Sequence, residues 1–296
     1  MTLAQPITAQ AAQPWSQENG QYVDASGKPI VGALEKGISV TKYQNRASKA
    51  AGGIDWGKVA ADGVKFAMVR LGYYKDMDPY FAMNLEGAAA NGIKTGAFFY
   101  TQALDVATAI NEAQYVLELV REYPISYPIA YDVESQHLLD SGLSKQQITD
   151  QVNAFCKTIS DAGYRPIVYA NQEWLSNHMD TAQIPYDIWY ARYGTINKYQ
   201  NRTIWQCTDS GTVAGIQGNV TIEFSFTDYV AQIPPDSWKF INGNWYYMKN
   251  YRKQIGWVQV KDHWYYLDSN GRRLHDAAAE IDGVSYTFGS DGMMTE

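Results

Sequence analysis

The chain has 296 residues, of which 46% are hydrophobic and 19% charged, which excludes a wholly disordered protein and suits one or two globular domains. Lys and Arg number 24 against 31 Asp and Glu, and no basic run is present, which argues against a nucleic-acid partner. No apolar run approaches the ~20 residues that a membrane-spanning helix needs. Aromatic residues make up 14% of the chain and many lie towards its C-terminus; such rings fill cores, stack on sugars or surround cations.

Residues 1–35 carry two signals that set them apart from the rest of the chain. Ala9-Gln10-Ala11 has the small-x-small pattern of a signal-peptide cleavage site, so the segment is interpreted as the remnant of a secretory leader. The run QYVDASGK at 21–28 resembles YLDSNGR at 266–272. We expect this run to form a stray hairpin that covers one end of the region that follows.

Residues 36–230 alternate between β-rich runs and segments with helical spacing. The predicted strands cover 64–70, 95–100, 128–134, 166–170, 187–192, 203–207 and 220–224. The predicted helices cover 54–63, 78–91, 106–123, 144–162 and a short segment from 171. This alternation predicts an α/β fold with a parallel sheet closed into a barrel. Because no long helix separates the last strands, we expect the barrel to be incomplete or flattened.

A linker at 231–237, which contains Pro234-Pro235, leads into a repeat over residues 238–296. Trp238 and Trp257 are 19 residues apart, as are Trp245 and Trp264. Each copy reads as strand, Gly-containing turn and strand, which predicts an array of hairpins that must stack to be stable. Residues 282–288 form a degenerate third copy, with Val and Ser at 284–285 where Trp and Tyr would fall.

The cysteines and histidines indicate no metal or redox site. Cys156 and Cys207 lie in different predicted elements, and sequence alone leaves open whether they pair. None of the 4 histidines has the spacing of zinc or iron ligands, so we expect neither a metal nor a cofactor.

Asp132 and Glu134 are the sharpest chemical feature of the sequence. Residues i and i+2 of a strand share a face, so both carboxyls are expected side by side at the C-terminal end of the strand 128–134. Active sites of barrels lie at that end, and mutual repulsion raises one of the two pKa values. A protonated Glu beside an ionised Asp suits protonation of a glycosidic oxygen. An exposed acidic strand end, or a pair with a metal or an arginine, is the alternative.

The central region resembles the glycoside hydrolase family 25 lysozymes (N-acetylmuramidases), in order, over about 195 residues. The resembling segments are 36–44 (KGISVTKYQ), 54–56 (IDW), 63–73 (GVKFAMVRLGY), 96–103 (GAFFYTQA), 131–134 (YDVE), 163–169 (GYRPIVY), 189–193 (WYARY), 205–206 (WQ) and 215–220 (GIQGNV). The resemblance implies a flattened, irregular β/α barrel that cleaves peptidoglycan at the bond between N-acetylmuramic acid and N-acetylglucosamine. It also implies that Glu134 is the general acid and that Asp132 is its partner, which orients the substrate N-acetyl group.

Two positions depart from the family pattern. Ser39 stands where the opening motif has Asp, and Thr221 stands where the closing strand has Asp. Neutral hydroxyls cannot stabilise an oxocarbenium-like state as an anion does. Glu223, two residues from Thr221 on the same strand face, is a candidate to return one carboxylate. Further residues at family motif positions are groove candidates, with packing as the competing role: Arg70, Tyr73, Tyr100, Trp189, Tyr193 and Gln206.

The departures leave competing functions open. The leading interpretation is a wall-targeted peptidoglycan hydrolase of lysozyme type, secreted by a bacterium or encoded by a phage. The first alternative is a wall-binding protein whose catalysis is impaired or lost, because the carboxylates expected at Ser39 and Thr221 are missing. The second is an enzyme for a variant amino-sugar polymer in which Glu223 has a new role.

The C-terminal repeats resemble the choline-binding, or cell-wall-binding, repeats of Gram-positive surface proteins. The resemblance implies that Trp pairs from one hairpin and an aromatic ring from the next enclose a cation. The partner is then choline or another wall polymer, while a purely structural role is the alternative. The candidate binding residues are Trp238, Trp245, Tyr247, Trp257, Trp264 and Tyr266.

Overall fold

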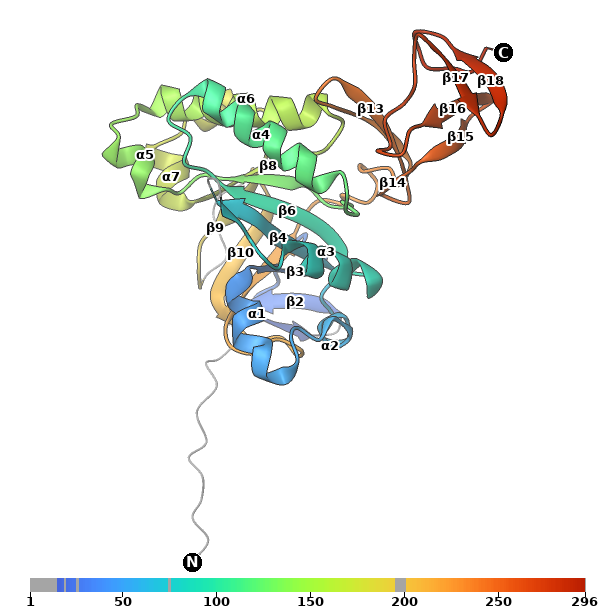
Figure 1. Ribbon diagram of the computed structural model, residues 1–296. Coiled ribbons are helices and arrows are strands. Elements are labelled where there is room, and N and C mark those ends of the chain that lie inside the picture. The colour runs from blue at the N-terminus through green and yellow to red at the C-terminus, as the bar shows by residue number, and fades with distance from the viewer. Residues whose placement is uncertain (1–14, 19, 25–26, 74–75, 195–200, 296) are drawn as a thin grey trace, which may run out of the picture.

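The computed structural model describes residues 15–18, 20–24, 27–73, 76–194 and 201–295. The predicted leader remnant at 1–14 lies outside the described residues. The chain folds into a barrel with helices around it and a tail of hairpins to one side (Figure 1). The predicted combination of an α/β barrel and C-terminal hairpin repeats is confirmed.

The barrel is a sheet whose two ends pair with each other. Its order is β3-β11-β10-β9-β8-β7-β6-β4, with an additional β3–β4 pairing that closes the ring and with β5 (Asp76–Met77) at the edge of β4. The barrel strands are β3 (Glu35–Val40), β4 (Phe66–Tyr73), β6 (Lys94–Tyr100), β7 (Ile129–Asp132), β8 (Pro166–Asn171), β9 (Asp187–Ala191), β10 (Arg202–Gly211) and β11 (Val220–Ser225). The ring is therefore closed, as predicted, which excludes the incomplete form of the two that the sequence left open.

Strand β11 is antiparallel to both of its neighbours, β10 and β3, whereas the other neighbouring pairs of the ring are parallel. The predicted parallel pairing therefore holds for the ring except at β11. Only the segment 212–219 joins β10 to β11, which is too short for a crossover helix, so the chain returns in the opposite direction.

Helices surround the barrel and are capped by side chains that the sequence supplies. Helix α4 begins after Asp105, whose carboxylate accepts from Thr108 N at 2.7 Å, and α6 begins with a capping box between Ser144 and Gln147. The helices are α1 (Lys42–Ser48), α2 (Trp56–Ala61), α3 (Phe81–Ala90), α4 (Val106–Val120), α5 (Gln136–Asp140), α6 (Lys145–Asp161) and α7 (Gln172–Asn177), with 3₁₀ turns η1 (Lys49–Ala51) and η2 (Thr181–Gln183).

The strands bury both of their faces, one under the helices and one inside the barrel. Phe98, Tyr169 and Trp189 meet in the interior, where the Trp189 ring lies 5.8 Å from Phe98 and 4.6 Å from Tyr169 between centroids. Because successive side chains alternate between faces, residues two positions further along these strands point into the carboxyl end of the barrel. Tyr100 reaches that end in this way.

An N-terminal hairpin of β1 (Trp15–Glu18) and β2 (Gln21–Asp24) packs against the outside of the barrel. The rings of Trp15 and Tyr22 lie 5.6 and 4.9 Å from Phe224 on β11. The turn after β2 closes with a bond from Asp24 N to Lys28 O, and the corresponding bond in the tail runs from Asp268 N to Arg272 O; both are 2.8 Å long. The two ends of the chain thus share one hairpin design.

The tail comprises three antiparallel hairpins within the described residues. They pair β12 (Ser237–Ile241) with β13 (Asn244–Lys249), β15 (Gly256–Val260) with β16 (His263–Leu267), and β17 (Ala277–Ile281) with β18 (Val284–Phe288); β14 (Arg252–Lys253) adds to β13. The first hairpin packs on the barrel, whereas the later ones extend away from it (Figure 1).

Ion pairs and a backbone bond hold the first hairpin against the helices. Arg252 pairs with Glu86 of α3 at 2.7 Å, Lys253 pairs with Glu122 after α4 at 2.6 Å, and Phe240 N donates to the carbonyl that ends α6 at 3.2 Å. Ile241, Tyr246 and Met248 join the core beneath the helices. The first repeat is therefore fixed to the barrel.

Two further findings concern the chain as a whole. Cys156 and Cys207 are both buried and free, so they do not form a disulfide. Among the helices that the structure describes, none is long and apolar enough to cross a membrane.

Candidate active site

Chemically active side chains gather at the carboxyl end of the barrel, as expected for parallel strands that meet at one edge. Asp132 ends β7, and it is flanked in register by Tyr100 on β6 and Tyr169 on β8. Across the ring, Gln206 on β10 pairs in register with Glu223 on β11. The predicted residues that meet at this end are Ser39, Arg70, Tyr100, Asp132, Gln206, Thr221 and Glu223.

Asp132 and Glu134 interact, but they are not both on the strand. Strand β7 ends at Asp132 and α5 begins at Gln136, so the predicted strand 128–134 is too long and Glu134 lies on the turn. Asp132 is only 5% exposed, and its Oδ1 atom has no hydrogen-bond partner among the described residues. Glu134 is less buried and lines a cleft of about 320 Å³ together with Tyr169, Asn171 and Tyr193.

Burial raises the pKa values of both carboxyls. Burial and the charge of Glu134 raise the pKa of Asp132 well above its usual range, although Arg70 lowers it in part. Burial also raises the pKa of Glu134, while a hydrogen bond with Asn171 lowers it in part. Asp132 is the more deeply buried of the two carboxyls. Glu134, partly open to a cleft, is placed to give up a proton.

The two positions that depart from the family pattern lie against each other. Ser39 on β3 and Thr221 on β11 join through their hydroxyls, Oγ to Oγ1, at 2.5 Å, and the Thr221 hydroxyl also accepts from Ser39 N at 2.9 Å. At this end of the barrel, residues 39 and 221 thus present two neutral hydroxyls that are hydrogen-bonded to each other.

Glu223 lies within the barrel. It lines neither the cleft beside Glu134 nor a second cleft, beside Arg70, that is described below. It is 0% exposed, and its Oε1 atom accepts from Gln206 Nε2 at 3.1 Å. Burial raises the pKa of Glu223 to about 7, while Thr221, Gln206 and Ser39 lower it in part. A carboxyl with such a pKa changes its charge near neutral pH without contacting solvent.

Gln206 links this buried carboxyl to the cleft beside Glu134. Its Oε1 atom accepts from the hydroxyls of Tyr169 at 3.0 Å and Tyr193 at 3.1 Å, while its amide donates to Glu223. Tyr193 is 49% exposed and lines the cleft. The polar network therefore runs from the surface to the barrel interior.

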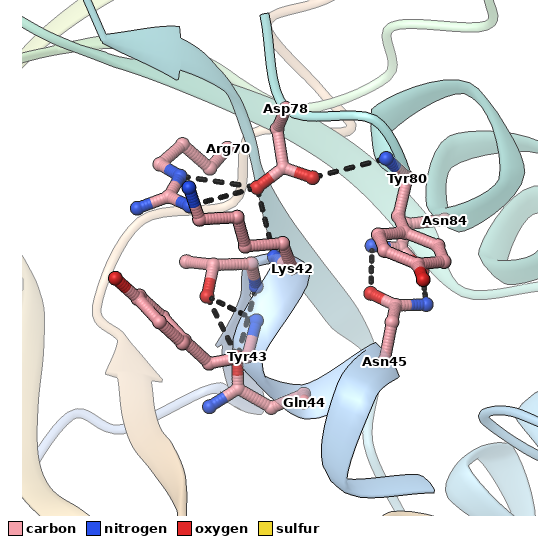
Figure 2. Close-up of polar contacts among 9 residues, drawn as sticks. Lys42, Tyr43, Gln44, Asn45, Arg70, Asp78, Tyr80 and Asn84 are labelled. Atoms are coloured by element: carbon pink, nitrogen blue, oxygen red, sulfur yellow. Dashed lines mark hydrogen bonds and ion pairs between the residues drawn. The ribbon is translucent and has the colours of Figure 1, made fainter. Parts of the chain in front are cut away.

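A second cleft of about 370 Å³ opens on the other side of the site, where Tyr73 and Tyr100 line it with ring centroids 6.0 Å apart. Figure 2 shows how Asp78 organises it. Arg70 Nη2 donates to one Asp78 oxygen at 2.9 Å and Lys42 N to the same oxygen at 2.8 Å, while Tyr80 N donates to the other at 3.0 Å. Asp78 thus fixes Arg70 at the edge of the cleft.

Sequence reasoning missed Asp78, Lys42 and Tyr43, all of which line this cleft. Asp78 lies outside the predicted strands and became significant only when folding placed it beside Arg70. In contrast, Trp189 is 0% exposed and packs inside the barrel, so its place is in the core and not in a groove.

The tail contains two groups of rings that we call the first and second aromatic boxes. Trp238 and Trp245 of the first hairpin lie 6.5 Å apart, and Tyr265 of the second hairpin lies 5.0 Å from Trp238. These three residues form the first box. Tyr247, a predicted binding residue, packs on Trp238 at 5.0 Å and is 8% exposed.

The second box repeats this arrangement one hairpin further on. Trp257 and Trp264 lie 6.3 Å apart, and Tyr286 of the third hairpin lies 4.8 Å from Trp257. With Met294, these residues line an open cavity of about 340 Å³. Tyr266, like Tyr247, packs against its hairpin's first Trp, at 5.1 Å. Sequence reasoning missed Tyr265, Tyr286 and Met294 because each comes from a later repeat than the Trp pair it joins.

Among the residues that the structure describes, no group of three or more His, Cys, Asp or Glu is arranged to hold a metal ion. The described side chains at the barrel end include carboxyls, hydroxyls, an amide and an arginine.

Comparison with known proteins identifies both parts of the chain. The sequence profile of glycosyl hydrolases family 25 matches residues 40–216, and that of a cell wall binding repeat matches residues 236–250 and 255–272. An autolytic lysozyme of Clostridium acetobutylicum is 26% identical over 201 residues, which are 64% of this chain and 56% of that protein.

Solved structures show the same fold. The modular autolysin LytC of Streptococcus pneumoniae matches with a TM-score of 0.62 and 26% identity, over 71% of this chain and 51% of that one. A family 25 glycosyl hydrolase from Bacillus anthracis matches with a TM-score of 0.57 and 22% identity, over 67% of this chain and 92% of that one. The chain spans about half the length of the Clostridium and Streptococcus proteins.

Proposed function

The chain belongs to glycosyl hydrolases family 25, and from this membership we propose that it hydrolyses the glycan strand of peptidoglycan between N-acetylmuramic acid and N-acetylglucosamine. The observation that carries the proposal is the coupled pair of Asp132 and Glu134 at the carboxyl end of the barrel, with Glu134 on a cleft. The relatives named above include an autolytic lysozyme and an autolysin, which supports the same substrate class.

In the proposed reaction, Glu134 gives its proton to the glycosidic oxygen as the bond from that oxygen to the anomeric carbon breaks. Burial raises the pKa of Glu134, which favours the proton-bearing form that a general acid needs. Asp132, which is buried beside Glu134, forms a hydrogen bond with the substrate N-acetyl group and so orients the sugar. Water then adds to the anomeric carbon and its proton returns to the Glu134 carboxylate.

The remaining site residues shape the groove. Tyr73, Tyr100 and Tyr193 are at least partly exposed at the clefts and offer ring faces to sugars, while Arg70 is held in place by Asp78. The proposed source of negative charge for the oxocarbenium-like transition state is Glu223, acting through the Ser39–Thr221 hydroxyls.

A second candidate function rests on the Ser39–Thr221 contact itself. Two neutral hydroxyls that satisfy each other at 2.5 Å leave no carboxylate on that wall of the groove. A protein of this kind would hold the glycan without cleaving it, and the hairpin tail would supply adhesion to the wall.

The test is to incubate the full chain with purified peptidoglycan, reduce the products with borohydride, and identify the sugar alcohol after acid hydrolysis. Hydrolysis at the proposed bond yields muramitol. Glucosaminitol would contradict the proposed bond and leave a hydrolase of different specificity. No sugar alcohol above the Glu134→Gln background, with the chain still sedimenting with the wall, would favour the binding protein.

We further propose that the tail attaches the chain to the cell wall, where it acts, through the aromatic rings of its hairpins. The residues that form this surface are Trp238, Trp245, Tyr247, Trp257, Trp264 and Tyr266, joined by Tyr265, Tyr286 and Met294. Rings at such spacing attract a quaternary ammonium such as choline. Sedimentation with insoluble walls should weaken when Trp264 is replaced by Ala in the full chain, and unchanged sedimentation would contradict attachment through this box.

A further inference from the structure

The two aromatic boxes have the same backbone frame but differ at one position. Arg273 N donates to Trp245 O at 2.8 Å, and Met294 N donates to Trp264 O at 2.9 Å. Each of these residues also forms an isolated bridge to the preceding strand, Arg273 with Leu267 and Met294 with the residue at 288. Arg273 therefore occupies in the first box the position that Met294 occupies in the second.

The side chain of Arg273 turns into the first box. Its guanidinium carbon lies 5.6 Å from the ring centroids of both Trp238 and Trp245, within the range of a cation–π contact. Its Nε atom is buried and has no hydrogen-bond partner among the described residues. The guanidinium therefore contacts both indole faces, and Tyr265 and Asp291 also interact with it electrostatically.

The second box offers a different environment. Trp257, Trp264 and Tyr286 present ring faces around an open cavity of about 340 Å³, and the thioether of Met294 completes the lining without a charge. This lining contains no carboxylate that could accept hydrogen bonds from a cation. It therefore suits a quaternary ammonium, which has no N–H groups to donate.

The N-terminal hairpin contains a third instance of the same ring pair. Trp15 and Tyr22 are seven residues apart, as are Trp238 and Trp245, and their centroids lie 6.0 Å apart. Here Lys36 Nζ lies 4.6 Å from the Trp15 ring and pairs with Asp62 at 3.0 Å, so a cation of this chain again contacts a Trp ring of the pair. The second box is the one in which the ring pair faces no lysine or arginine of the described chain.

We propose that Arg273 is a built-in cation that closes the first aromatic box, so that the tail takes one quaternary ammonium ligand per chain, in the second box. This inference rests on the proposed wall attachment and adds to it the number and place of the sites. An internal cation loses no translational freedom on entering the rings, so a free ligand at millimolar concentration competes with it poorly. Arg273 is then a specificity-determining residue of the tail.

The experiment is a calorimetric titration of the full chain with choline chloride at constant ionic strength. We expect one site in the wild type, none in Trp264→Ala, and two in Arg273→Met, which gives the first box the side chain of the second. Arg273→Gln is the companion variant and should also show two sites. Arg272→Met is the matched control; Arg272 is the exposed neighbour, and its loss removes the same charge but leaves one site.

Two sites in the wild type, or one site in both folded Arg273 variants, would overturn the proposal. An absence of binding in every variant would overturn it as well, because the second box would then not accept the cation. The sugar-alcohol assay needs no choline, so a titration that contradicts the number of sites does not affect the hydrolase proposal. In the same way, a negative sugar-alcohol assay does not affect the number of choline sites. Far-ultraviolet circular dichroism of each variant verifies that it is folded.

Discussion

Replacement of Glu223 by Gln should stabilise the protein at neutral pH and have little effect in acid. The carboxyl is fully buried, and no cation among the described residues lies against it to offset the loss of water. Its pKa rises from the ordinary 4.5 to about 7. At about 1.4 kcal/mol per pKa unit, this difference corresponds to roughly 3 kcal/mol of stability.

The sign follows from which state holds the proton. Below pH 4.5 the Glu223 carboxyl is protonated in both the folded and the unfolded chain, so it does not lower the free energy of unfolding. Between pH 4.5 and about 7 the unfolded chain loses this proton while the folded chain keeps it, so the free energy of unfolding falls as pH rises. Gln at this position still accepts from Gln206 Nε2 but does not titrate.

The assay is urea unfolding followed by Trp fluorescence at a series of pH values from 4.5 to 7.5. The gain in the free energy of unfolding for Glu223→Gln over wild type should grow by roughly 3 kcal/mol across that range. Asp161→Asn is the matched control, since Asp161 lies on the exposed face of α6 and should give a nearly constant difference. A difference for Glu223→Gln that is flat with pH would refute the buried-carboxyl reasoning.

Two further substitutions test the core and the groove. Phe155→Ala removes a fully buried ring that stacks on Tyr131 at 3.9 Å, and should cost about 3–5 kcal/mol in urea unfolding; a loss below about 1 kcal/mol would mean that this part of the core repacks freely. Thr221→Asp places a carboxylate beside Ser39, where the neutral hydroxyl pair now lies, and should raise the turnover of peptidoglycan at least about tenfold. Unchanged turnover would show that the neutral pair does not limit catalysis.

The sequence predicted the barrel because its strands and helices alternate with clear stop signals. Asp105 and Ser144 cap the two long helices as their residue types indicate, and the predicted strands lie close to the observed ones. The reversed direction of β11 was not predicted, because it follows from the short connection 212–219 between β10 and β11.

The sequence predicted several residues of the candidate site, but it did not predict their burial or the contacts between their charged groups. Period-two spacing placed Asp132 at the strand end, yet the turn that carries Glu134 and the depth of Asp132 arise from packing. The contact of Arg70 with Asp78 joins a strand to a later loop, which no local pattern encodes. In the tail, the repeat period gave the Trp pairs, but the cation provided by Arg273 became visible only once the hairpins were stacked.

The most direct test of the account is the rate at which Glu134→Gln releases new reducing ends from peptidoglycan, measured against wild type. Removal of the proton donor should lower that rate by about 10²- to 10⁴-fold, while sedimentation with walls stays unchanged. Asp161→Asn, an amide substitution on the exposed face of α6, should release reducing ends at the wild-type rate. A Glu134→Gln protein that turns over within threefold of wild type would contradict the assignment of Glu134 as the general acid.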